Sequence, residues 1–261
     1  MSVETNDHWL SQPSRPHTQL QSADLGALEA LPVTRREYHP GQYLLREGDR
    51  PKFCSYLQNG MVYRHKIVGN GGRQVLSLHV AGDFVDAQNF LLDHADHNIQ
   101  ALTYAMVAMV PIEQLTITII KHPAIARLLW RETLIDAAVS RVWLTNIGRR
   151  DARSRTAHML CEIAVRREAA GLGPRETFDL PMTQEQLGDT LGLTAVHVNR
   201  TLKSLQDDGL ILRTKRSITV ADWHALRSVA DFSADYLHLP PSPALSPALS
   251  PALPPALPPP A

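Results

Sequence analysis

The stretch that decides the fold is TQEQLGDTLGLTAVHVNRTLKSL, residues 183–205. Thr183 and Gln186 have the spacing of a capping box, which predicts that a helix begins at Thr183. Gly192 can end that helix because glycine accepts the left-handed conformation, and Thr194 can cap a second helix. The stretch therefore predicts two short helices that are joined by a tight turn.

The second helix has an apolar side and a polar side. Val198, Leu202 and Leu205 recur at helical spacing and should pack on the first helix, which Gly188 allows to approach closely. This layout is typical of a helix-turn-helix, whose second helix enters the major groove of DNA. The polar side carries Val196, Asn199, Arg200 and Lys203, with His197 at its edge.

The polar side suits the edges of bases. Arg200 can bind guanine through two hydrogen bonds, Asn199 can read adenine or hold a phosphate, and Val196 can touch a thymine methyl group. An ordinary solvated face on a helical hairpin is the alternative. Two elements are predicted before this stretch, an amphipathic helix at 149–170 and a strand at 178–180. Together with the segment that follows, they favour DNA binding.

That following segment is GLILRTKRSITV, residues 209–220. It predicts two short strands around a basic turn, and a hairpin beside a recognition helix is a wing. Its cations suit phosphates, which position a protein on DNA without specifying a sequence. The basic residues of this wing are Arg213, Lys215 and Arg216.

Residues 123–148 predict one long helix that opens at Pro123, since proline suits the first turn. The helix is apolar on two faces and should have two partners, namely the β domain and the same helix of a second subunit. Burial within one subunit is the alternative. The face that we assign to dimerisation contains Leu128, Ile135, Val139 and Val142. The second apolar face contains Leu129, Leu134, Trp143 and Leu144.

Residues 35–111 have a different sequence pattern, in which short apolar runs are separated by glycine-containing turns. This spacing is typical of an all-β sandwich or barrel, and GNGG at 69–72 predicts a hairpin turn. Residues 19–31 predict a short helix. The chain should therefore combine a β domain with helical segments, which is an α+β fold.

Composition limits the function less than these motifs do. The 261 residues carry 26 basic and 26 acidic side chains, although residues 149–220 hold 12 basic and 9 acidic ones. Two cysteines favour a reduced compartment, and neither a signal peptide nor a membrane span is evident. We expect a soluble cytoplasmic protein that has no membrane partner. The SPAL repeats after Pro240 predict an extended, dispensable tail.

Three further stretches extend the pattern: PGQYLLREGD at 40–49, LQNGMVYRHKIVGNGGRQVLSLHVAGDFVD at 57–86 and ITVADWHALRSVADFSADYL at 218–237. With the helix-turn-helix they make the chain similar to the Crp/Fnr family of bacterial transcription regulators over about residues 31–237. The resemblance implies a homodimer that binds a palindromic site on double-stranded DNA and contacts RNA polymerase. It implies an effector-binding-like β-roll with a jelly-roll topology at 23–122, a dimerisation helix at 123–148 and a winged helix-turn-helix at 149–237. Composition predicts a flexible segment at 1–22 and a disordered tail at 238–261.

By position, Val196, Asn199 and Arg200 match the base-reading residues of that family, and Arg200 matches its near-invariant arginine. Well-known members have a glutamate at the position of Val196. A glutamate accepts a hydrogen bond from cytosine, which valine cannot do. The resemblance therefore implies a different half-site preference for this chain.

The effector region departs from the family pattern. Cyclic-nucleotide binders carry a Gly-Glu pair and an Arg-Ser/Thr-Ala run, but here Ala87 and His97 stand near the glutamate and arginine positions. No basic residue occurs between Arg73 and Lys121. We therefore predict that the effector is not cyclic AMP, and two cysteines cannot hold an iron–sulfur cluster. The candidate effector-binding residues are Asp86, Gln88, Asn89 and His97.

Three alternatives stay open at this point. His94 and His97 could ligate haem or a metal, although a solvated loop is the favoured interpretation, and no metal is assigned. A cupin-like metalloenzyme has a related β-roll, but the chain has no H-x-H pair, P-loop or catalytic triad, so no catalytic residue is assigned. An adaptor could keep a winged helix for contacts with proteins. We expect a regulator rather than an enzyme.

Overall fold

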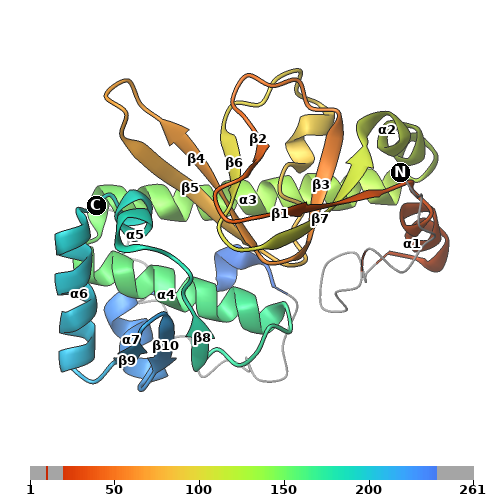
Figure 1. The fold of residues 1–261 in the computed structure, drawn as a ribbon. Helices are drawn as coiled ribbons and strands as arrows, with labels where there is room; N and C mark the ends of the chain where they lie inside the picture. The colour runs from red at the N-terminus through yellow and green to blue at the C-terminus, as the bar shows by residue number, and fades with distance from the viewer. Residues whose placement is uncertain (1–9, 11–19, 240–261) are drawn as a thin grey trace, which may run out of the picture.

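The structure of this chain is a computed structural model that describes residue 10 and residues 20–239. The chain forms an N-terminal β domain, a long helix and a C-terminal winged helix (Figure 1). This order is the α+β arrangement that the sequence predicts. The SPAL repeats and almost all of segment 1–22 lie outside the described residues.

The β domain contains two antiparallel sheets with strand orders β1-β7-β3 and β2-β6-β4-β5. Apolar side chains from both sheets fill its interior, for example Leu57, Val62, Ile99 and Val107. Gly71, at φ 83°, lies in the predicted hairpin turn between β4 and β5. The strands are β1 Thr34–Tyr38, β2 Tyr43–Leu45, β3 Phe53–Asn59, β4 Met61–Ile67, β5 Arg73–Val80, β6 Asn98–Ala101 and β7 Ala105–Pro111.

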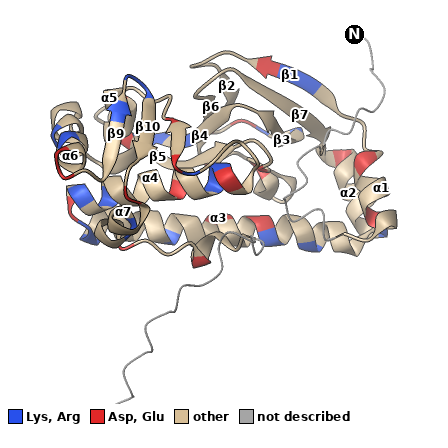
Figure 2. Ribbon diagram, turned by 90° about the horizontal axis from the view of Figure 1, so that it is seen from below, with Lys and Arg blue, Asp and Glu red and all other residues tan. Residues whose placement is uncertain are grey.

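The long helix α3 (Pro123–Arg149) has 27 residues and begins at proline, as predicted. It lies beneath the β domain and continues to the winged helix, where α4 lies alongside it (Figures 1 and 2). Three short helices of the β domain contact it: α1 (Ser22–Glu29), the 3₁₀ helix η2 (Ala87–Phe90) and α2 (Ile112–Lys121). In the described part of the chain, no helix is long and apolar enough to cross a membrane.

The winged helix begins after a two-residue break in which Asp151 caps α4 by accepting from the Ser154 N–H at 2.8 Å. Its small sheet has the order β8-β10-β9. The predicted strand at 178–180 is present one residue earlier. The elements are α4 Ala152–Ala169, β8 Thr177–Asp179, α5 Gln184–Leu191, α6 Ala195–Asp207, β9 Ile211–Thr214, β10 Ser217–Val220, α7 Trp223–Ala230 and the 3₁₀ helix η3 Asp235–Leu237.

The apolar core of the winged helix continues into the β domain. Tyr63 of β4 and Leu78 of β5 belong to the same buried cluster as Ile163 of α4 and Leu187 of α5. We call this cluster the shared core. Because burial of apolar area stabilises contacts in proportion to that area, the winged helix is packed on the four-stranded sheet rather than tethered to it.

We predict that Gly188→Ala lowers the free energy of unfolding by about 1–3 kcal/mol. A Cβ at residue 188 would lie 2.5 Å from the carbonyl oxygen of Leu193, so the backbone has to move. Gly148→Ala is the matched control, because nothing lies within 4 Å of a Cβ there and alanine should stabilise α3 by up to about 1 kcal/mol. Urea denaturation measures both variants, and an unchanged stability of Gly188→Ala would contradict the close contact between α5 and the turn that follows it.

Candidate nucleic-acid interface

Both helices of the predicted helix-turn-helix, α5 and α6, begin at side-chain caps. The Gln186 N–H donates to the Thr183 hydroxyl at 3.1 Å and the Thr183 N–H donates to the Gln186 side chain at 2.8 Å, which confirms the capping box. Gly192 ends α5 at φ 61°, and the His197 N–H donates to the Thr194 hydroxyl. Each threonine hydroxyl accepts in its cap, which leaves its own proton free for a phosphate.

The inner side of α6 is apolar, as the sequence predicts. Val198, Leu202 and Leu205 are buried in the shared core together with Leu187 and Leu191 of α5. The two helices therefore move as one unit. Burial of this side turns the opposite side of α6 toward solvent.

That opposite side of α6 is open. Val196 is 69% exposed although it is apolar, so nothing in the subunit covers it. The guanidinium of Arg213 on β9 donates to the Asn199 side-chain oxygen at 3.4 Å and so links the wing to α6. The exposed residues of this side are Val196, His197, Asn199, Arg200 and Lys203.

The wing is the β9–β10 hairpin, whose turn places Lys215 at φ 53°. The sheet holds this turn, because the Leu180 N–H donates to the Arg216 carbonyl at 2.8 Å. Lys215 and Arg216 are exposed, whereas Arg213 is half-buried beside α6. Basic residues colour this hairpin and parts of α6 in Figure 2. An open helix face flanked by a basic hairpin is the geometry of DNA recognition by a winged helix.

Comparison with known proteins agrees with this geometry. Residues 154–229 match the Crp-like helix-turn-helix domain, and residues 35–122 match the cyclic nucleotide-binding domain. The transcriptional activator protein FnrL of Cereibacter sphaeroides is 31% identical over 219 residues, which are 82% of this chain and 87% of FnrL. The chain belongs to the Crp/Fnr family of transcription regulators. It is a DNA-binding regulator, as the sequence predicts.

Other Crp/Fnr proteins are similar along most of their length. The fumarate and nitrate reduction regulatory protein of Escherichia coli K12 is 27% identical over 229 residues, which are 88% of this chain and 91% of that protein. The solved structure of FixK2 from Bradyrhizobium japonicum has a TM-score of 0.70 at 23% identity. It covers 77% of this regulator and 99% of FixK2, and it shares the fold.

The β domain of this regulator contains a buried cation that the sequence pattern did not reveal. Arg64 of β4 is 6% exposed, donates from Nε to the Val85 carbonyl at 3.0 Å and forms an ion pair with Asp136 of α3. The gap in basic residues between Arg73 and Lys121 therefore does not leave the domain interior without a cation. Strand alternation, which turns Arg64 inward with Val62, is the signal that could have found it.

The candidate effector residues do not share one environment. Asp86 is buried and accepts from the N–H and hydroxyl of Ser55, at 2.5 and 2.8 Å, so its carboxylate joins η2 to β3. Burial raises the pKa of Asp86 to about 6. Asn89 is buried and Gln88 is half-buried on the following 3₁₀ helix.

The favoured interpretation of His94 and His97 as a solvated loop is wrong for His97. His97 is 6% exposed and its Nδ1 lies 2.6 Å from Asp96, whereas His94 is exposed and contacts Arg50. Burial lowers the pKa of His97. Among the described residues, no group of three or more His, Cys, Asp or Glu side chains could hold a metal ion.

The outer surface of α3 corrects the sequence prediction of its dimerisation face. Leu128 and Val139 are buried in the subunit's own cores, so they cannot face a partner, and Ile135 and Val142 are half-buried. The residues of the two predicted apolar faces alternate along α3. Packing against the β domain determines which residues are buried in the subunit and which stay exposed. One row of exposed positions follows spacings of three and four residues: Trp130, Leu134, Arg141 and Leu144, with half-buried Ala137 between them. We call these five residues the α3 stripe.

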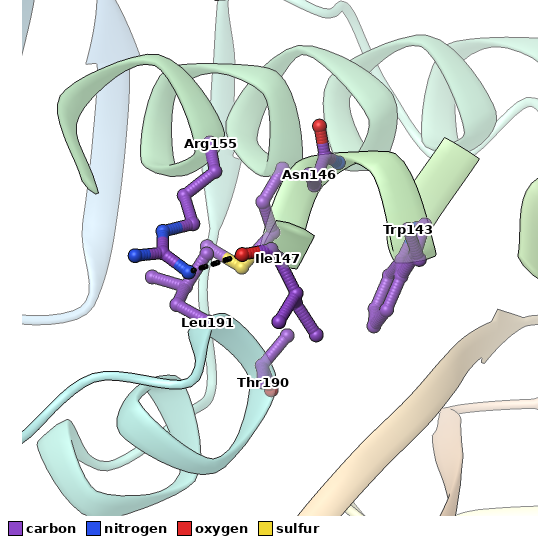
Figure 3. A pocket seen from close by; sticks show the side chains of 7 residues that line it. Trp143, Asn146, Ile147, Arg155, Thr190 and Leu191 are labelled. Atoms are coloured by element: carbon purple, nitrogen blue, oxygen red, sulfur yellow. Dashed lines mark hydrogen bonds between the residues drawn. The ribbon is translucent and has the colours of Figure 1, made fainter. Parts of the chain in front are cut away.

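A small hollow lies where the end of α3 meets α4 and α5 (Figure 3). Arg155 points toward the end of α3 and donates to the Ile147 carbonyl at 3.5 Å. The hollow lies at the junction between the end of the long helix and the helix-turn-helix. It is lined by Trp143, Asn146, Ile147, Arg155, Met159, Thr190 and Leu191.

We predict that the protein loses stability as the pH falls from about 6.5 towards 4. His65 is fully buried between Tyr43 and Tyr63, and burial, with the charge of Arg73, lowers its pKa to about 4 from 6.5. In this window the unfolded chain binds a proton that the folded chain does not, so stability is complete above pH 6.5 and decreases below it. His158, with a pKa of about 4, acts in the same direction. Asp86 acts in the opposite direction below about pH 6 because its pKa is raised, but one carboxylate offsets only part of the effect of two histidines.

Urea denaturation at pH 7 and pH 5 measures this loss. His65→Leu should reduce the difference between the two midpoints, because the leucine cannot take up a proton in either state. An unchanged difference would contradict the buried position of His65.

Proposed function

We propose that this regulator binds a palindromic promoter site as a homodimer and controls transcription through contact with RNA polymerase. The open outer side of α6 beside the basic wing is the observation that supports DNA reading by these residues. A two-fold dimer presents two copies of α6, and successive half-sites then lie one helical turn apart. Such a protein acts where the chromosome lies, in the bacterial cytoplasm.

We assign direct base reading to Val196, Asn199 and Arg200. An arginine pairs with guanine through O6 and N7, and the exposed Val196 side chain can contact a thymine methyl group. We assign phosphate contacts, which fix register, to the remaining residues of the interface. These are Thr183, Thr194, His197, Lys203, Arg213, Lys215 and Arg216.

We propose that two subunits pair along the α3 stripe. Outward positions that repeat at alternating spacings of four and three residues are the pattern of a two-stranded coiled coil, and three of the five positions of the stripe carry large apolar side chains. Trp130, Leu134 and Leu144 are 66%, 57% and 73% exposed, which is costly for a helix that stays single in water. Ile135 and Val142 flank the stripe and would lie at its margin.

We propose the domain limits 23–122 for sensing, 123–148 for dimerisation and 149–237 for DNA binding. We also infer that the signal is not carried by an iron–sulfur cluster. Such a cluster needs four ligands, usually cysteine thiolates, whereas the chain has two cysteines, Cys54 in β3 and Cys161 in α4. Burial raises the pKa of both thiols, to about 12 for Cys161, so neither supplies a thiolate at neutral pH.

We infer that cyclic AMP is not the effector. The described residues fit it poorly, because Asp136 already neutralises Arg64, and Ala87 and His97 stand near the family's glutamate and arginine positions. A cyclic phosphate would have to displace the Asp136 carboxylate from the buried guanidinium of Arg64, which would leave that carboxylate without its ion-pair partner. The effector is therefore a different molecule, or the regulator responds to its own abundance.

Arg200→Ala tests the recognition face. It should reduce the preference for a selected operator over random duplex by about 1–3 kcal/mol, because one bidentate base contact is lost. Lys203→Ala is the matched control on the same face and should weaken both duplexes about equally. Fluorescence anisotropy at fixed salt measures both preferences. An unchanged preference in Arg200→Ala would show that α6 does not read bases.

Leu134→Glu combined with Leu144→Glu tests the dimer. Four carboxylates in the paired stripe should convert the dimer to monomers at micromolar concentration, since burial of unpaired charge outweighs the apolar contact. Ile120→Glu, at a residue of α2 that is 74% exposed and lies outside the stripe, should leave the dimer intact. Light scattering gives the mass, and a persisting double-mutant dimer would place the interface elsewhere.

A further inference from the structure

A short connection holds the wing against the recognition helix. The helix α6 ends at Asp207 and β9 begins at Ile211, and Gly209 takes φ 71° in the turn between them. The Leu210 N–H donates to the Leu205 carbonyl at 3.0 Å, and the side chains of Leu205 and Ile211 are fully buried. The strand therefore cannot shift along α6 without losing buried contacts.

Strand alternation turns Arg213 toward α6. Side chains of a strand alternate between its two faces, so Ile211 and Arg213 lie on the same face of β9. Ile211 is buried in the shared core, whereas Leu212 on the opposite face is 56% exposed. Arg213 is half-buried, and its backbone pairs with that of the buried Ile218 on β10. The fold of the wing therefore directs the Arg213 guanidinium to α6.

The Arg213 guanidinium meets Asn199 on the base-reading side of α6. Its Nη1 donates to the Oδ1 of Asn199 at 3.4 Å. A guanidinium has five N–H donors and no acceptor, so it can face the oxygen of an amide but not the NH₂ group. The contact therefore determines which end of the Asn199 amide faces the wing. Asn199 is exposed, so the NH₂ group at the other end is available to DNA.

This orientation changes what Asn199 can read. An asparagine that binds adenine uses both ends of its amide, since the NH₂ group donates to N7 and the oxygen accepts from the N6 amino group. Here the oxygen already accepts from Arg213, whose N–H donors would lie beside the adenine amino group, another donor. The free NH₂ group needs an acceptor instead. Guanine offers O6 and N7 and thymine offers O4, whereas cytosine offers its N4 amino group.

We propose that Arg213 is a specificity-determining residue, which orients Asn199 so that α6 selects a keto base, guanine or thymine, at the position that Asn199 contacts. Adenine and cytosine present amino groups in the major groove and are disfavoured there. Arg213 is a positioning residue in this role, and its other N–H groups stay available to a phosphate. The inference deepens the proposed base reading by α6 and rests on it.

Operator duplexes that differ at one base pair test this role. Selection from random duplexes gives the operator, and Asn199→Ala locates the base pair, because the preference disappears at the position that Asn199 contacts. Wild-type protein should accept two versions, with guanine or thymine on the same strand, and bind them about three- to tenfold more tightly than the other two, the range of one hydrogen bond. Arg213→Ala frees the amide to turn over, so the adenine version should then bind within about twofold of the keto versions.

Two further variants separate orientation from charge. Arg216→Ala removes a cation from the same hairpin and should weaken all four duplexes by a similar factor without changing their order. Asn199→Asp can still pair with Arg213 but has an acceptor in place of the NH₂ group, so the order should reverse in favour of cytosine and adenine. A loss of stability alone could not reverse the order. Fluorescence anisotropy at fixed salt measures all of these affinities.

Four results would overturn the inference. These are a wild-type preference for adenine alone, an order that Arg213→Ala leaves unchanged, an order that Arg216→Ala changes as much as Arg213→Ala does, and an Asn199→Ala variant that keeps every preference. Arg200→Ala separates this failure from failure of the recognition face. If Arg200→Ala loses operator preference in any of these four cases, α6 reads bases as proposed and only the role of Arg213 is wrong.

Discussion

The structure depends on a buried guanidinium, that of Arg166, between the β domain and α4. It donates to the Leu78 carbonyl at 2.7 Å, to Asp83 at 2.8 Å and to Glu162 at 3.4 Å. A buried cation is tolerated only when acceptors surround it, and two of these three acceptors belong to the β domain. The two domains therefore have one favourable relative position, because a displacement would remove acceptors from a charge that is largely shielded from water.

The shared core follows from this constraint. Glu162, which contacts Arg166, also accepts from the indole of Trp143 at 2.9 Å and from the Tyr236 hydroxyl at 2.7 Å. One carboxylate thus connects α3, α4 and the C-terminal 3₁₀ helix η3. This junction and the apolar packing around it fix the orientation of α6 relative to the four-stranded sheet. The β domain and the winged helix are parts of one packed body in this Crp/Fnr protein.

The long helix serves this arrangement because its two faces have different partners. Its inner face supplies Leu128 and Leu129 to the core beneath the β domain and Val139 to the shared core. Its outer face leaves the α3 stripe in solvent. Asp136 adds a polar contact by pairing with Arg64 inside the β domain. A ligand that alters Arg64 therefore acts on the same helix that carries the stripe.

Local sequence determined the helix-turn-helix by itself. Its signals are short-range: the capping box at Thr183, the left-handed Gly192 and the apolar spacing of α6. The interactions behind these signals all lie within about 20 residues of sequence. The long helix and the β4–β5 hairpin were predictable for the same reason. Tertiary structure alone decided which face of α3 is free, that His97 is buried and that Arg64 pairs with Asp136. These three features depend on contacts between residues that are distant in sequence. A heptad or strand pattern does not by itself determine which face is buried, and only tertiary packing decides it.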